Sequence, residues 1–246
     1  MTANNQRNFV AEGQKMQIGI ADDDKGVLDY LERTLEPQGY PCMRFSDGRE
    51  LIKALPRETF DLLIVDWNMP EQSGIEVIHW AQKNLALCPP IILMTSRSSG
   101  DDIVRGLEIG ADDYIVKPEN ANVILARVRS ALRRARPQAA TERFQSYGSF
   151  DFDRSNNSVN MKGETVSLTP KEFALAELFF RNGHRPLSRG YILQNVWHSV
   201  ADLPTRTLDM HVSRVRAKLK LKPENGFRLQ TVFGFGYRFE QFDSVE

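Results

Sequence analysis

The first half of the chain alternates short apolar runs with longer amphipathic stretches. The apolar runs are rich in Ile, Leu, Val or Met and cover residues 16–21, 40–45, 61–66, 91–95 and 114–117. Short runs of this kind are typical of strands that are buried on both faces. Stretches with helical spacing of apolar residues follow them at 27–35, 48–55, 74–84, 101–110 and 123–135. This alternation predicts βαβ crossovers and a doubly wound α/β domain with a five-stranded parallel sheet.

The second half has a different pattern. Strand-like pieces over 150–168 precede a helix that opens at Thr169-Pro170, with an N-cap threonine and proline at the first helical position. Two more helices are expected at about 189–197 and 205–221, and residues 227–239 should form a closing hairpin. The expected turn residues are Asn156-Asn157, Lys162-Gly163, Gly234 and Gly236. Small strands, three helices and a terminal hairpin predict a winged helix-turn-helix domain of the α+β class.

Four segments follow from these patterns. Residues 1–15 are polar and are expected to be a disordered tail, and residues 16–135 form the α/β domain. Residues 136–146 are a polar, proline-interrupted linker, and residues 147–242 form the winged-helix domain.

The distribution of charge and the cysteines limit the classes of protein to which the chain can belong. The chain is neutral overall, but residues 1–135 carry 16 Lys and Arg against 20 Asp and Glu, whereas the remainder carries 16 against 12. The basic second half suggests a polyanionic partner. Cys42 and Cys88 match no metal or redox spacing, no apolar run is long enough to span a bilayer, and no signal peptide begins the chain. We therefore expect a soluble cytoplasmic protein that does not engage a membrane.

Polar side chains of different kinds follow four of the predicted strands. They are Asp22 and Asp23, Asp66, Thr95 and Lys117. The carboxyl ends of parallel strands share one edge of a sheet, so these groups should converge there. Clustered carboxylates repel one another unless a divalent cation is bound, and oxygen ligands favour Mg²⁺. Asp66, alone at the end of its strand, is the expected nucleophile for an acyl phosphate.

The motifs IADDD, IVDWNMP, LMTSR and GADDYIVKP resemble those of a two-component receiver domain. LTPKEF and the closing GFGYRF resemble the winged-helix output domain of OmpR/PhoB-type response regulators. The resemblance covers about residues 16–240. It implies a flavodoxin-like receiver and a DNA-binding transcription regulator rather than an enzyme. It also implies a sensor histidine kinase, double-stranded DNA and RNA polymerase as partners, and a homodimer.

The resemblance implies a role for each residue of the acidic site. Asp66 would be the phosphoacceptor, Thr95 and Lys117 would contact the phosphoryl group, and Tyr114 would be the aromatic switch. The implied Mg²⁺ ligands are Asp22 (through water), Asp23, Asp66 and the backbone carbonyl of Asn68. The Lys117-Pro118 peptide bond would be cis.

Two departures from the family concern activation. Glu119 follows Lys117-Pro118, where the family usually has an aromatic residue. Paired charges on the face of the fourth helix, fifth strand and fifth helix join family dimers. Asp113 with Arg127, and Asp112 with Arg133 or Arg134, would supply two such pairs, but Ile103 and Val123 replace a third. We hypothesise that Ile103 and Val123 form an apolar contact across a dimer.

The third helix of the second half has the character of a DNA-recognition helix. Leu208, Val212, Val215 and Leu219 lie on one face at helical spacing. The opposite and flanking positions carry Arg206, Thr207, Met210, His211, Ser213, Arg214, Ala217, Arg216, Lys218 and Lys220. A helix of this kind suits a major groove. Arg214 is the first choice for a base contact, and His211, Arg216 and Lys218 are expected to contact phosphates.

The predicted wing departs from the family as well. Phe233 replaces the arginine that often precedes the first wing glycine, although Tyr237 and Arg238 remain available for phosphate contacts. Trp197 is expected near the DNA backbone or in the core. Residues 198–204 lie where relatives contact RNA polymerase.

Two alternatives remain open. One is a DNA-binding protein whose receiver serves only for dimerisation, which Glu119, Ile103 and Val123 favour. The other is a phosphohydrolase with Asp66 as its nucleophile, which Asn68 opposes because such enzymes commonly carry an acid at that position.

Overall fold

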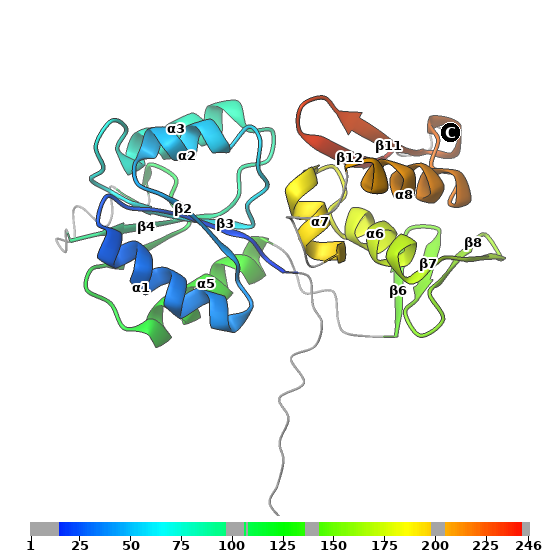
Figure 1. Cartoon of the computed structure of the whole chain (residues 1–246), viewed down its shortest axis with the longest axis horizontal. Helices are drawn as coiled ribbons and strands as arrows, with labels where there is room; N and C mark the ends of the chain where they lie inside the picture. Colours follow the sequence, from blue (N-terminus) through cyan, green and yellow to red (C-terminus); the bar gives the residue numbers. More distant parts are fainter. Residues whose placement is uncertain (1–14, 97–105, 107, 136–142, 198–204, 243–246) are drawn as a thin grey trace, which may run out of the picture.

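The computed structural model describes residues 15–96, 106, 108–135, 143–197 and 205–242. They form two domains that lie side by side, an α/β domain and a smaller α+β domain (Figure 1). The expected N-terminal tail, most of the helix at 101–110 and most of the linker lie outside the described residues. Within the described part of the chain, no helix has the length and hydropathy needed to cross a bilayer.

The first domain contains the predicted five-stranded parallel sheet. Its strands are β1 (Ile18–Ala21), β2 (Cys42–Phe45), β3 (Leu62–Asp66), β4 (Ile91–Thr95) and β5 (Asp113–Val116). They lie in the order β2-β1-β3-β4-β5, and every neighbouring pair is parallel. The order reverses between β1 and β3, which opens a crevice at the carboxyl ends of these two strands.

Helices cover both faces of this sheet. Helices α1 (Lys25–Leu35) and α5 (Ala121–Ala135) lie on one face, and α2 (Gly48–Ala54) and α3 (Gly74–Asn84) lie on the other (Figure 1). Alternate strand residues point to opposite layers: Ile64 packs toward α1 and α5, whereas Val65 packs toward α2 and α3. Both faces need apolar side chains, which explains why the strands read as unbroken apolar runs.

The second domain begins with an antiparallel sheet of four short strands. They are β6 (Phe144–Tyr147), β7 (Phe150–Asp153), β8 (Ser158–Met161) and β9 (Glu164–Ser167). Strand β6 corrects the predicted linker, because residues 144–146 pair with β7 instead of belonging to a flexible connection. The turns at Asn157 and Lys162-Gly163 adopt positive φ, as expected from their sequence.

The rest of this domain is a winged helix. Helices α6 (Pro170–Arg181), α7 (Arg189–Trp197) and α8 (Thr205–Lys218) are followed by the hairpin β11 (Phe227–Val232) and β12 (Gly236–Gln241). Strand β10 (Pro186–Ser188) was not predicted; it pairs with β12 and completes a three-stranded sheet. Helix α8 ends at Lys218, three residues earlier than predicted. The short turns η1 (Glu36–Gln38) and η2 (Pro223–Asn225) complete the elements.

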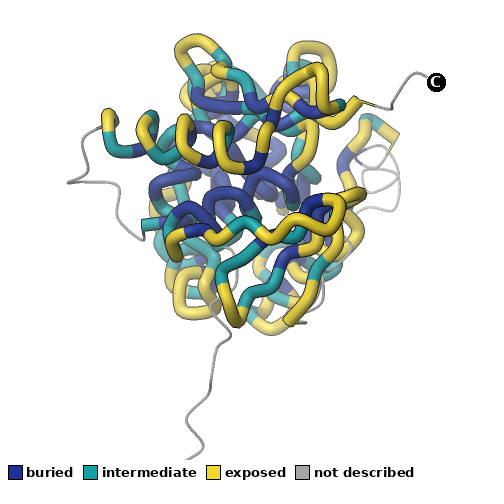
Figure 2. The backbone as a smooth tube through the Cα atoms, turned by 90° about the vertical axis from the view of Figure 1, so that its right-hand side faces the viewer, coloured by how far each residue is buried: buried dark blue, intermediate teal, exposed yellow. Residues whose placement is uncertain are grey.

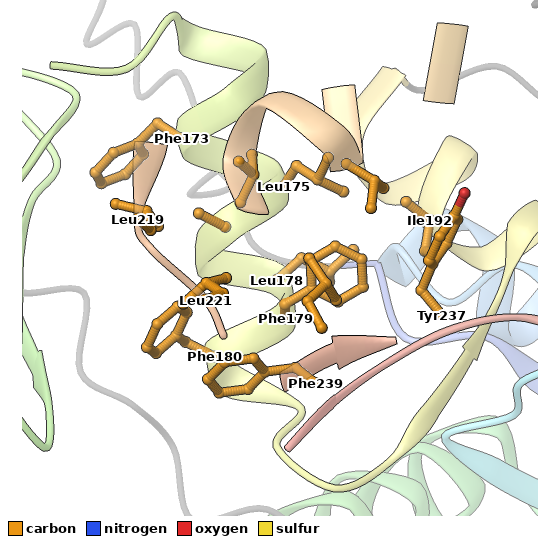
Figure 3. Packing of buried hydrophobic residues seen from close by; sticks show 14 of the residues in the cluster. Phe173, Leu175, Leu178, Phe179, Phe180, Ile192, Leu219, Leu221, Tyr237 and Phe239 are labelled. Atoms are coloured by element: carbon orange, nitrogen blue, oxygen red, sulfur yellow. The ribbon is translucent and has the colours of Figure 1, made fainter. Parts of the chain in front are cut away.

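The core of the winged-helix domain is rich in aromatic side chains. The ring of Phe180 packs against Phe150, Phe152 and Phe239, with ring centroids 4.3–5.0 Å apart. Figure 3 shows Phe180 beside Phe239. Helix α6 lies at the centre of this core, and its residues are largely buried (Figure 2). The predicted start of α6 is confirmed by a capping box, in which the Thr169 side chain accepts from the Glu172 backbone and Glu172 bonds the Thr169 backbone.

Candidate functional site

The acidic residues of the first domain lie at the crevice between β1 and β3. Asp22 directly follows β1, and Asp66 is the last residue of β3. The side chains of both are almost completely buried, with exposed fractions of 2% and 8%. Two carboxylates from remote parts of the sequence therefore share a nearly water-free edge of the sheet.

Lys117 joins these two carboxylates. It directly follows β5, and its ammonium nitrogen lies 2.5 Å from Asp22 Oδ2 and 2.6 Å from Asp66 Oδ1. The Lys117-Pro118 bond is cis, as the resemblance implied. One cation against two carboxylates leaves the cluster with a net charge of about −1, before Asp23 is counted.

Burial and charge alter the protonation of this cluster. Burial raises the pKa of Asp22, although the hydrogen bond from Lys117 lowers it, and the pKa remains above its usual value. Burial lowers the pKa of Lys117, but its hydrogen bonds to Asp22 and Asp66 outweigh burial, and the pKa lies above its usual value. The lysine is therefore fully charged at neutral pH.

The backbone around Asp66 is held closely by the segment that follows it. The amide of Asn68 donates to Asp66 Oδ2 at 2.8 Å, and the amide of Gly74 donates to the carbonyl oxygen of Trp67 at 3.0 Å. A Cβ atom at Gly74 would lie 2.3 Å from the carbonyl oxygen of Asp66. Gly74 therefore has a packing role that its sequence context, a loop leading into a helix, did not reveal.

Thr95 and Tyr114 come from the two strands beyond Asp66. Thr95 ends β4 and is fully buried, and its carbonyl oxygen accepts from the Lys117 amide at 2.8 Å. Tyr114 lies in β5 and is buried, with its ring edge-on to Trp67 at a centroid distance of 6.4 Å. Tyr114 is therefore a core residue of the receiver and not a half-exposed tyrosine on the surface of a strand.

The donor atoms at this edge suit a hard divalent cation. Asp23 is exposed directly beside Asp22, whereas Asp66 is buried at the end of β3, and both carry carboxylate oxygens at this edge of the sheet. Mg²⁺ keeps several waters and needs only one or two protein carboxylates, and a cation would offset the excess negative charge. No group of three or more acidic, His or Cys side chains among the described residues is already arranged as a metal site. The residues fit Mg²⁺ by charge and donor type.

Helix α8 presents a polar face to solvent, as predicted. Leu208, Val212, Val215 and Leu219 are at most 1% exposed. Arg206, Met210, Ser213, Arg214 and Ala217 are all exposed on the opposite side. The amphipathic assignment of this helix is therefore confirmed.

Several predicted phosphate-contacting groups are instead engaged within the domain. Lys218 Nζ lies 2.8 Å from Glu172 Oε2, Arg216 Nε donates to the Leu229 carbonyl oxygen at 2.9 Å, and Arg238 pairs with Glu240 at 2.7 Å. The Lys218 pair holds a carboxylate that is 2% exposed, so this lysine has a structural task.

His211 and Trp197 form a contact between α8 and α7. His211 Nδ1 donates to the Thr207 carbonyl oxygen at 2.8 Å, and its ring is edge-on to Trp197 at 5.2 Å. Trp197 is half-buried. Thr207 is also half-buried.

A cluster at the base of the wing was not found from the sequence. Arg189 of α7 pairs with Asp209 of α8 at 2.7 Å, and the Tyr237 hydroxyl donates to the same Asp209 carboxylate. Tyr237 is 4% exposed. In this structure the Tyr237 hydroxyl joins the wing to α8 through Asp209, and its contact with DNA phosphate stays a prediction. At the wing tip, Phe233 is fully exposed.

The proposed dimer face shows one of its two expected charge pairs within a single chain. Arg127 lies 2.7 Å from Asp113. The carboxylate of Asp112 instead accepts from the Ile91 amide at 2.7 Å, and Arg134 reaches only the Asp112 carbonyl oxygen. Asp112 thus caps β4, and no ion pair between it and Arg134 forms. Ile103 and residues 198–204 lie outside the described residues.

The fold and the site define a class of protein: an acidic receiver joined to a winged-helix DNA-binding domain. Residues 18–129 match the family described as "Response regulator receiver domain", and residues 163–239 match "Transcriptional regulatory protein, C terminal". The chain belongs to the response regulators of the OmpR/PhoB type, which are DNA-binding transcription factors and not enzymes.

Relatives resemble the chain over nearly its whole length. It is 36% identical over 240 residues to a "Probable transcriptional regulator ycf27" of Porphyridium aerugineum, covering 94% of this chain and 99% of the relative. It is 34% identical to the "Sensory transduction protein RegX3" of Mycobacterium tuberculosis, covering 90% and 97%. Among solved structures, the Thermotoga maritima regulator DrrB is 27% identical, with a TM-score of 0.45 and coverage of 92% and 99%.

Membership of this family implies a sensor kinase and DNA as partners. The receiver family typically uses Mg²⁺.

Proposed function

We propose that phosphoryl transfer to Asp66 controls dimerisation and promoter binding by this transcription factor. The observation that carries this proposal is the distance of 2.6 Å between Lys117 Nζ and Asp66 Oδ1 at the crevice between β1 and β3. An ammonium group next to the acceptor carboxylate neutralises oxygens of an incoming phosphoryl group. A sensor histidine kinase supplies that group.

The residues of the chain divide the work of this reaction. Bound Mg²⁺ would be held by Asp22 through water, by Asp23 and Asp66, and by the backbone carbonyl of Asn68, and it supplies charge neutralisation. Lys117 contacts one phosphoryl oxygen, and the hydroxyl of Thr95 donates to another. Movement of Thr95 toward the phosphoryl group draws Tyr114 further inward and shifts the equilibrium of the dimer face.

The test is incubation of the full chain with Mg²⁺ and acetyl phosphate, followed by intact-mass measurement. We expect a gain in mass of one phosphoryl group. Asp66→Asn should abolish this gain, although the variant retains other acids such as Asp22 and Asp61. Sedimentation should show a rise in dimer. No gain in mass would favour a receiver that acts only as a dimerisation module, and rapid turnover of phosphate esters would favour a hydrolase.

We also propose that dimerisation uses the face formed by β5 and α5 together with Ile103. Val123 is 37% exposed, and it borders an open hollow of about 420 Å³ that Asp113, Asn122 and Arg127 also line. A small apolar contact there would replace a screened ion pair. Val123→Glu should weaken the phosphorylated dimer. Lys53→Gln, at an exposed position of α2, changes the net charge by the same amount and should leave the dimer affinity unchanged. Equal dimer affinity in both variants would remove Val123 from the interface.

DNA binding is proposed to place α8 in the major groove. Arg206, Met210, Ser213 and Arg214 offer the exposed face of α8, Thr207, His211, Arg216 and Lys218 flank it on the same helix, and Arg238 lies on β12 of the wing. RNA polymerase contact is proposed for residues 198–204. Selection of duplexes from a random library by the phosphorylated chain identifies the operator.

A further inference from the structure

The ring of Phe233 at the tip of the wing does not contribute to the core of its domain. Its side chain is fully exposed, whereas Tyr237 and Phe239 on the following strand are buried. Residues 229–237 contain no charged side chain, so the tip cannot attract a DNA phosphate through an ion pair. A single exposed apolar residue is common on protein surfaces. The support beneath this one is what makes it informative.

The turn that carries Phe233 is fixed by several backbone contacts. The amide of Phe235 donates to the Val232 carbonyl oxygen at 3.0 Å and closes the turn. The carbonyl oxygen of Phe235 accepts from the Arg189 amide at 3.1 Å, which ties the turn to the start of α7. A Cβ atom at Gly236 would lie 2.1 Å from a backbone oxygen of β10, so the hairpin and β10 are in close contact there. A ring presented on such a support loses little backbone entropy when it binds.

The wing is also fixed to the helix that is expected to read DNA. Asp209 of α8 accepts a hydrogen bond from Tyr237 of β12 and pairs with Arg189 of α7 at 2.7 Å. In Figure 1 the hairpin lies beside α8 and its turn projects past the helix. When α8 lies in a major groove, the hairpin lies along the duplex, and the neighbouring groove is a minor groove about 6 Å wide. The orientation of α8 therefore sets the position of Phe233 on that groove.

The receiver does not cover the wing tip. Phe233 borders an open hollow of about 260 Å³ whose receiver side includes Leu85 and Leu87, and Leu87 is 52% exposed. The ring stays fully exposed at this hollow, so the described residues of the receiver leave it available to another partner.

The chemistry of the ring suits a base step better than a phosphate or a base edge. Phenylalanine has no hydrogen-bond donor for the acceptors on the floor of the minor groove, and no charge for the phosphates. Its ring can stack on a base that has been partly unstacked, and apolar side chains inserted in this way kink the duplex. TA, CA and TG steps are the most easily kinked. A ring at the wing tip therefore selects DNA by its deformability.

We propose that Phe233 is a wedge that inserts between two base pairs from the minor groove and bends the operator. The insertion confers a preference for a TA, CA or TG step at a fixed distance from the base that Arg214 contacts. This inference rests on the proposed function only in that α8 binds a major groove. It does not depend on phosphoryl transfer to Asp66.

The first test compares Phe233→Ala with Phe144→Ala in the full chain. Phe144 is a phenylalanine on β6 of the same domain that is 57% exposed, so it provides a matched control. The duplex is a selected operator that carries a donor and an acceptor dye at its two ends, saturated with protein. The unmodified chain and Phe144→Ala should bend it by at least about 20°.

Phe233→Ala should leave the duplex nearly straight and bind it about 10-fold more weakly, which is the effect expected for the loss of one stacked ring. Phe233→Leu should retain most of the bend, because leucine also acts as a wedge. The loss of affinity should be independent of salt concentration, because the ring carries no charge. Equal bending by the unmodified chain and Phe233→Ala overturns the wedge.

The second test locates the insertion with 2-aminopurine, placed at one operator position at a time. Its fluorescence rises when the base unstacks, and one step should brighten with the unmodified chain but not with Phe233→Ala. Replacing that step by a stiffer AA step should weaken binding by the unmodified chain about as much as the loss of the ring does, and should change binding by Phe233→Ala little. Additive losses from the two changes overturn the proposal.

The outcomes separate a failure of the wedge from a failure of the proposed function. If α8 does not read DNA, neither the unmodified chain nor Phe144→Ala binds a selected operator, and both proposals are overturned. If the wedge alone is wrong, binding persists and neither the bend nor the brightening depends on Phe233. A weaker dimer for Phe233→Ala with an unchanged bend assigns the ring to a protein contact, which also overturns the wedge.

Discussion

The ammonium group of Lys117 lies 2.6 Å from the carboxylate of Asp66, although the two residues come from the ends of different strands. Strand β4 separates β3 from β5 in the sheet, so the lysine side chain reaches across a neighbouring strand. It meets Asp22 there as well. This arrangement sets both the stability and the reactivity of the acidic crevice.

Lys117→Met should destabilise the receiver at neutral pH by about 3–5 kcal/mol, because two buried carboxylates lose their cation. Burial already raises the pKa of Asp22, and in the variant the lowering effect of Lys117 on that pKa would be lost. An acid with a raised pKa in the folded state loses stability as pH rises, so the deficit should shrink as pH falls toward the folded pKa of Asp22. Chemical denaturation between pH 7 and pH 5 measures this, with Lys53→Met as the control. A deficit that does not change with pH would contradict the assignment.

Mg²⁺ should stabilise the receiver. At about 100 times its dissociation constant, a ligand that binds only the folded state adds about 2.7 kcal/mol. We expect the thermal midpoint of the receiver transition to rise with Mg²⁺, and Asp66→Asn to remove most of the rise. Glu71→Gln, an exposed acid in the following loop, should leave it intact. An equal rise in all three chains would indicate nonspecific binding.

The ion pair between buried Glu172 and partly exposed Lys218 should stabilise the DNA-binding domain. Burial raises the pKa of Glu172, but Lys218 and the Thr169 backbone lower it further, and the folded pKa lies below its usual value of 4.5. This contribution is therefore present above the unfolded pKa and is lost as pH falls through the folded one. Lys218→Met should cost about 1–2 kcal/mol at pH 7, since the lysine is partly exposed.

Lys220→Met is the matched control for that variant. Lys220 pairs with Glu164 on the surface, where both side chains are more than half exposed. Its loss should cost well under about 1 kcal/mol. If the two variants unfold at the same denaturant concentration, burial does not strengthen the Glu172 pair.

Arg214→Ala should weaken binding to a selected operator by about 1–3 kcal/mol and relax preference at one base position. The reason is that Arg214 is exposed on the outer face of α8, opposite the buried leucines and valines. Lys222→Ala, beyond the end of α8, should instead weaken binding about equally for all sequences and reduce its salt dependence. A uniform loss across all sequences for Arg214→Ala would make it a phosphate contact.

Much of this molecule could be predicted from local pattern. The buried strands, the capped start at Thr169 and the amphipathic α8 all follow from side-chain chemistry and period. Strand β10 could not be predicted, because it is three residues long and exists only through pairing with β12. Strand β6 could not be predicted either, because it is also short and forms by pairing with β7.

The acidic site was predictable because strand ends converge in a parallel sheet. The pairing of Lys218 with Glu172 could not be predicted, because helical period alone placed the lysine at the edge of the exposed face. Its partner Glu172 is 46 residues away in sequence. The ion pair between Asp61 of the receiver and Arg185 of the DNA-binding domain was missed for a similar reason: nothing local distinguishes these residues from ordinary surface charges, and only the packing of the two domains buries them.

The tryptophans give each domain a native optical probe. Trp67 follows Asp66 in sequence and packs against Tyr114, whereas Trp197 touches His211 beside the recognition helix. Trp80 lies half-buried on α3, and Trp80→Phe would leave one indole fluorophore per domain. Emission from the two indoles would then report events at the crevice and at the helix separately, without any attached dye.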